Sequence, residues 1–71
     1  MMSLLSVKTG EKGIVYSLKT IDPSLIHKLM ALGIMPGIEI QLEQKFPSYI
    51  IKIGRTRATL DQETAAQIYL Q

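Results

Sequence analysis

The sequence predicts a mainly β protein: a small β-barrel of about five short strands, with one short helix inserted after the first strand and a short helical turn before the last. Three observations indicate this class. Short segments alternate between apolar and polar residues, Gly- and Pro-containing turns separate those segments, and residues 22–33 show a helical period instead. A barrel is favoured because closure removes sheet edges that a very small open sheet would leave exposed.

Length and composition limit the classes of protein that fit. The chain has 71 residues, so we expect residues 1–71 to form one domain, and its 46% apolar and 20% charged residues argue against disorder. No apolar run approaches the roughly 18 to 20 residues that cross a bilayer. The N-terminal stretch also lacks the features of a secretory signal, so we expect a cytoplasmic protein. The sequence has no cysteine, which excludes disulfides, thiolate metal sites and cysteine nucleophiles.

The helical segment has clear start and stop signals. Asp22 is a good N-cap because its carboxylate can accept hydrogen bonds from N–H groups of the first turn, and Pro23 suits the first helical position. Gly33 stands where a left-handed residue should end the helix, and Ile34 can then fold back on Leu29 as in a Schellman cap. Apolar residues three and four apart form the expected buried stripe: Leu25, Ile26, Leu29, Met30 and Leu32.

The strands before and after this helix are predicted from alternation. Residues 14–19 form the first strand, since β-branched and aromatic residues alternate there with smaller or polar ones. After the helix, Met35-Pro36-Gly37-Ile38 suits a type II turn, where Pro presets its own dihedral and Gly accepts a positive φ. The apolar residues that follow alternate with Glu and Gln from residue 38 to residue 43. This segment is the clearest strand in the chain.

The C-terminal third predicts a hairpin and a closing strand. Residues 49–53 and 56–60 flank Gly54-Arg55, which has Gly first as a type II′ turn requires. Pairing across this turn places Ile51 opposite Ala58, and Lys52 opposite Arg57 on the other face. Asp61 can then cap a short helical turn that runs to about residue 66, and residues 68–70 form a last strand.

Two stretches of this chain resemble the FeoA family. They are Leu-Leu-Ser-Val-Lys-Thr-Gly-Glu-Lys-Gly at residues 4–13 and His-Lys-Leu-Met-Ala-Leu-Gly-Ile-Met-Pro-Gly-Ile-Glu-Ile at residues 27–40. The most specific part is Leu-x-x-Leu-Gly-Ile-x-Pro-Gly at residues 29–37, and the resemblance extends over essentially the whole chain. It implies an SH3-like barrel and a small cytoplasmic accessory protein of the ferrous iron transporter FeoB, which carries a GTPase domain. In that role the protein would lie at the inner face of the membrane through its partner.

The sequence departs from the commoner FeoA pattern at two points. Arg55 stands where a second Gly often follows the first, and the loop at residues 45–48 is short. A similar SH3-like domain also occurs in metal-dependent transcription regulators, so the fold alone does not fix the function.

No set of residues predicts catalysis, a cofactor or a metal site. His27 is the only histidine, so no cluster of His and Cys ligands can form within one chain, although metal binding is a family-level property. Glu39 and Glu43 lie four residues apart on one strand, which separates them by about 13 Å, too far for a paired acid and base. We therefore expect a protein that is not an enzyme.

Two groups of residues are candidates for binding a protein partner. The first lies at the helix end and the following turn: Met30, Ile34, Met35 and Pro36. Met30 is expected mainly in the core, whereas residues 34–36 are the best candidates for an exposed contact, since methionine adapts to varied partner surfaces. The second group is the basic set Lys52, Arg55 and Arg57 on the hairpin, whose alternative role is a solvated face.

Three functional hypotheses remain open at this stage. The first is regulation of ferrous iron uptake through contact with the cytoplasmic part of FeoB. The second is a nucleic-acid-binding barrel that uses Lys45, Lys52, Arg55 and Arg57 with Tyr49, although a net charge of +2 counts against it. The third is a peptide-binding SH3-like module. Self-association is left open.

Overall fold

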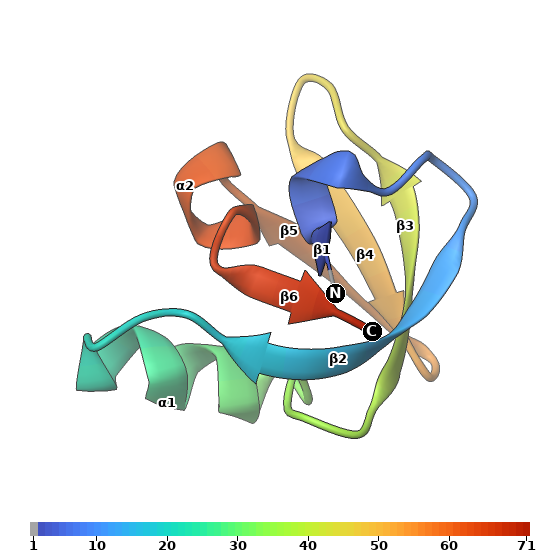
Figure 1. Cartoon of the computed structure of the whole chain (residues 1–71). Coiled ribbons are helices and arrows are strands. Elements are labelled where there is room, and N and C mark those ends of the chain that lie inside the picture. Colours follow the sequence, from blue (N-terminus) through green and yellow to red (C-terminus); the bar gives the residue numbers. More distant parts are fainter. Residues whose placement is uncertain (1) are drawn as a thin grey trace.

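The computed structural model describes residues 2–71. Six antiparallel strands form one strongly curved sheet in the order β1-β6-β2-β3-β4-β5. Figure 1 shows that β2 and β6 run across the direction of β3 and β4, as in a small barrel. The strands are β1 (Met2–Ser3), β2 (Lys12–Leu18), β3 (Glu39–Gln44), β4 (Tyr49–Ile53), β5 (Thr56–Leu60) and β6 (Ile68–Leu70). The helices are a 3-10 turn η1 (Leu4–Ser6), α1 (Pro23–Ala31) and α2 (Gln62–Ala65).

The mainly β class and the order of elements predicted from the sequence are confirmed, with one strand more than expected. The additional strand is β1, in which Met2 pairs with Leu70 at the end of β6. Because β1 has only two residues, it cannot show the alternation of apolar and polar residues that predicts a strand. The first strand predicted at residues 14–19 is β2, which begins two residues earlier. Gly13 therefore lies inside a strand, where an added Cβ would meet the side chain of Leu70 at 2.9 Å.

The hairpin matches its prediction residue for residue. Ile51 pairs with Ala58, Lys52 pairs with Arg57, and Gly54 has a φ of +59° at the turn between β4 and β5. Two-residue loops of this kind match the right-handed twist of the flanking strands, which is why the local sequence was sufficient to predict the register.

The caps of both α-helices are also confirmed. Asp22 Oδ1 accepts a hydrogen bond from the N–H of Ser24 at 2.9 Å, and Asp61 Oδ1 accepts one from the N–H of Thr64 at 2.7 Å. At the end of α1 the N–H of Ile34 donates to the carbonyl of Leu29 at 2.9 Å, and Gly33 has a φ of +89°. These are the features of a Schellman motif.

The core fills the inside of the curved sheet. It combines alternate residues of the strands with Leu4 of η1, Val7, Leu29 of α1, Ile34 and Ala65 of α2. The side chains with almost no exposed surface are Leu4, Val15, Leu29, Ile34, Ile40, Leu42, Ile51 and Ile68. Only Leu29 is buried among the residues of α1, so one side of this helix closes the barrel and the remainder faces outward.

Candidate partner-binding surfaces

The prediction that Ile34 is an exposed contact is wrong. Its side chain is 0% exposed and belongs to the core. The reason is the Schellman motif, because the residue after the left-handed glycine folds back over the last turn of the helix. The prediction that Met30 packs mainly in the core is also wrong, since 45% of its surface is exposed. The two residues have exchanged the roles that the sequence suggested.

Exposed apolar side chains do gather around the turn that follows α1. Pro36 is exposed, Met35 is half-buried, and Ile38 is 37% exposed. The N–H of Ile38 donates to the carbonyl of Met35 at 3.1 Å, and Gly37 has a φ of +94°, as the predicted type II turn requires. This turn is held against β2, because Val15 exchanges hydrogen bonds with Gly37 and Ile38 at 2.8 and 2.9 Å.

Two neighbouring elements add to this surface. Tyr16 follows Val15 on β2 and is 51% exposed, whereas Val15 itself points into the core. Met30 is the last residue but one of α1, beside the start of the same connection. We call this surface the apolar face, and it consists of Tyr16, Met30, Met35, Pro36 and Ile38. The sequence analysis missed Tyr16 and Ile38; the one available signal was that an amphipathic tyrosine tolerates a half-exposed strand position better than valine does.

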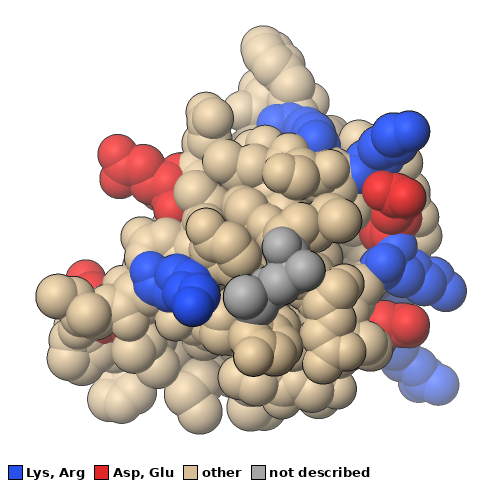
Figure 2. Space-filling view, viewed as in Figure 1, with Lys and Arg blue, Asp and Glu red and all other residues tan. Residues whose placement is uncertain are grey.

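Charged residues are sparse over this part of the molecule. Figure 2 shows that Lys, Arg, Asp and Glu alternate along one side of the view, whereas the surface over α1 and β2 has fewer charges, with a basic side chain and some acidic atoms beside a mainly uncharged area. Exposed apolar residues that cluster, rather than scatter singly, mark sites where a protein meets a partner.

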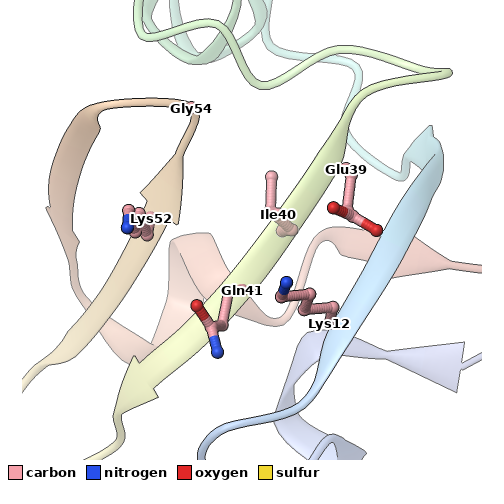
Figure 3. Close-up of a pocket in the computed structure, with 6 residues that line it drawn as sticks. All are labelled: Lys12, Glu39, Ile40, Gln41, Lys52 and Gly54. Atoms are coloured by element: carbon pink, nitrogen blue, oxygen red, sulfur yellow. The ribbon is translucent and has the colours of Figure 1, made fainter.

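The basic residues of the hairpin lie in a row across the outer face of the sheet. Lys12 pairs with Gln41, Gln41 pairs with Lys52, and Lys52 pairs with Arg57, so one residue of each strand from β2 to β5 contributes. We call these four residues the cross-strand row. Figure 3 shows the side chain of Gln41 between those of the two lysines. An open depression of about 160 Å³ is lined there by Lys12, Glu39, Ile40, Gln41, Lys52 and Gly54.

Arg57 differs from the two lysines because a carboxylate neutralises it. Its Nε donates to Glu43 Oε1 at 2.6 Å, and its Nη2 donates to Glu43 Oε2 at 3.2 Å. Hydrogen bonding to this carboxylate and its negative charge raise the pKa of the Arg57 guanidinium. Among residues 2–71 this is the one ion pair within salt-bridge distance, so Lys12 and Lys52 form no ion pair in this part of the chain, although Glu39 lines the same depression.

The predicted basic set is therefore only partly a group of free charges. Arg55 is exposed at the tip of the hairpin, Lys52 is half-buried beside the depression, and Arg57 bends over the sheet toward β3. The sequence analysis missed Lys12 and Gln41, because cross-strand neighbours from β2 and β3 become visible only when the register of the sheet is known.

The described part of the chain shows neither a metal-binding cluster nor a membrane-spanning helix. Within residues 2–71, no three His, Asp or Glu side chains lie in position to hold a metal ion together, and His27 is exposed on α1. No helix among these residues has the length and apolar character needed to cross a bilayer.

The fold and these surfaces define a small SH3-like domain. The structure of Stenotrophomonas maltophilia FeoA complexed with zinc, described as a prokaryotic SH3 domain protein, superimposes with a TM-score of 0.86 at 21% identity, covering 100% of this chain and 91% of that one. The chain belongs to the FeoA family, since the sequence model of the FeoA domain matches residues 2–71. This family is linked to ferrous iron transport.

Two further similar structures show the range of proteins that contain this fold. A crystal structure of an iron uptake regulatory protein (FeoA) gives a TM-score of 0.87 at 26% identity and covers 99% of this chain and 93% of that one. A manganese-dependent transcriptional repressor gives 0.85 at 18% identity over 96% of this chain, which spans only 39% of the repressor. No protein in the curated set matches the sequence.

Proposed function

We propose that this protein is a non-enzymatic accessory protein of ferrous iron uptake, which acts in the cytoplasm by binding the cytoplasmic GTPase region of a FeoB transporter. The observation that supports the proposal is the apolar face: β2, the end of α1 and the turn before β3 all carry exposed apolar residues, and hydrogen bonds from Val15 hold this turn against β2. Membership of the FeoA family supplies the class of partner.

The chemistry of the two surfaces gives each a part in this binding. The apolar face would supply affinity, because burying exposed apolar area is favourable at about 25 cal/mol per Å². The lysines of the cross-strand row and Arg55 would orient the domain toward acidic surface, because charge complementarity acts mainly on approach and specificity. A small interface of this type gives weak, reversible binding, which suits a regulatory contact.

The test is a titration of the purified chain into the isolated cytoplasmic GTPase region of the transporter encoded with it, followed by calorimetry and by NMR of the labelled chain. We expect saturable binding and shifts that concentrate on the apolar face. Met30→Glu places a carboxylate in that face and should weaken binding by about tenfold or more, equivalent to ~1.4 kcal/mol.

Phe46→Glu is the matched control. Phe46 is an aromatic residue outside this face, and 79% of its surface is exposed in the loop between β3 and β4. It should leave binding within about twofold of the unchanged chain. The proposal fails if the two proteins do not associate at about 1 mM, or if Phe46→Glu weakens binding as much as Met30→Glu does.

A further inference from the structure

The strand β5 lies at the end of the sheet, and one of its two long sides has no strand beside it. The sheet order places β4 on one side of β5, while the other end of the sheet is β1. All of the strand pairing of β5 is with β4, from the pair Ile53–Thr56 to the pair Tyr49–Leu60.

The register decides which backbone groups of β5 are unpaired. Ile53 and Thr56 flank a two-residue turn, and such a flanking pair is hydrogen-bonded in both directions. Antiparallel pairs alternate between bonded and non-bonded, so Ala58 and Leu60 also bond to β4. The N–H and C=O groups of Arg57 and Thr59 therefore point away from β4, and no other backbone hydrogen bond is formed by them in the described part of the chain.

This edge has few of the features that usually prevent a strand from pairing with another molecule. Those features are proline, a β-bulge, a very short strand, or charges at the edge. β5 has five residues, contains no proline and pairs with β4 without a register shift. Its one charged side chain, Arg57, is held over the sheet by Glu43 on β3. Thr56, Arg57 and Thr59 are all exposed.

We propose that two copies of this chain associate through β5, antiparallel and edge to edge, in a register centred on Ala58. This register places Arg57 of each copy opposite Thr59 of the other, so the four outward N–H groups of the two copies donate to the four outward C=O groups. Like charges do not lie directly opposite each other, whereas a register centred on Arg57 would oppose two guanidinium groups. At the centre two Ala58 residues meet, and their small side chains permit the close approach of a non-bonded antiparallel pair.

The pair should be weak and therefore dependent on concentration. Two five-residue strands bury less than the roughly 1,200 Å² of a stable interface. The proposal does not use the apolar face, since β5 is separated by two strands from β2, which carries Tyr16.

The unchanged chain provides the first test, by sedimentation equilibrium and amide hydrogen exchange from about 20 µM to about 1 mM, a range that brackets weak dissociation constants. We expect the mean mass to rise toward that of a dimer, and exchange at the Arg57 and Thr59 amides to slow by about threefold or more. The Ala58 amide is the internal control, because it already bonds to β4 and should not change.

A pair of variants at one position gives the second test. Thr59→Pro removes an outward N–H that the isolated chain does not use, and proline is tolerated at such edge positions, so the fold should persist while dimerisation is lost. Thr59→Ser keeps the N–H and should dimerise like the unchanged chain. The proposal is overturned if the chain stays monomeric at about 1 mM, or if it dimerises with unchanged exchange at Arg57 and Thr59. Since exchange is measured on the unchanged chain, a misfolded Thr59→Pro variant does not affect this outcome.

Discussion

Ile34→Ala is expected to destabilise the protein severely, although the residue follows a glycine in a connection between a helix and a strand. Ile34 is 0% exposed, and its backbone is fixed by the hydrogen bond to Leu29. Truncating a buried isoleucine to alanine removes about 2 to 5 kcal/mol, because transfer energy is lost and a cavity remains. A chain of this length has a total stability of only about 4 to 10 kcal/mol, so this loss is a large fraction.

Urea denaturation followed by circular dichroism measures this effect, with a thermal melt as a second readout. A loss of about 3 kcal/mol corresponds to a melting temperature lower by about 12 to 24 °C. Ile34→Val should lose about 0.5 to 1.5 kcal/mol, as a graded step. Met30→Ala is the matched comparison and should lose less than about 1 kcal/mol, because Met30 is 45% exposed. If Ile34→Ala costs no more than Met30→Ala, the burial of Ile34 and the reasoning based on it are refuted.

Two further predictions concern individual polar groups. Hydrogen bonds from Thr64, first from its side chain and then from its backbone, lower the pKa of Asp61. The stability that this carboxylate contributes is therefore fully present above its unfolded pKa of about 3.9 and is lost as the pH falls through its lower folded value. Asp61→Asn retains a capping oxygen but should flatten the dependence of stability on pH below about 4, and an unchanged slope in acid urea titrations would contradict this. Ser17 Oγ is buried without a hydrogen-bond partner in the described part of the chain. Ser17→Ala should therefore leave the free energy of unfolding unchanged or raise it by up to about 1 kcal/mol. A loss of more than about 1 kcal/mol would show that the hydroxyl has a partner.

Local chemistry predicted most of the fold because its signals depend on few residues. The caps at Asp22 and Asp61, the turn at Gly37 and the hairpin at Gly54 each depend on dihedral angles and hydrogen bonds within a few positions. The strand β1 could not be predicted in this way, since two residues carry no period and their pairing with β6 is a contact between the two ends of the chain.

The surfaces were harder to predict because exposure depends on tertiary contacts. Met30 and Ile34 are both apolar and lie close together in sequence, and only the direction of the chain after Gly33 decides which of them is buried. The ion pair of Arg57 with Glu43 likewise joins residues on β5 and β3 that are fourteen positions apart. Sequence patterns pointed to the turn after α1, where Met35 and Pro36 lie, but the tertiary structure was needed to add Tyr16 and Ile38, and the register of the sheet was needed to place Lys12 beside Gln41.

The positions of the apolar face and of the free edge of β5 allow both to be occupied at once. The apolar face lies around β2 and the turn before β3, whereas the free edge belongs to β5, and the strands β3 and β4 separate them in the sheet. Residues that share no contact usually act additively. Thr59→Pro should therefore leave binding to the transporter region unchanged, and Met30→Glu should leave self-association unchanged. If either variant altered both processes, the two surfaces would be parts of one interface, and a dimer would then be the form that the transporter binds.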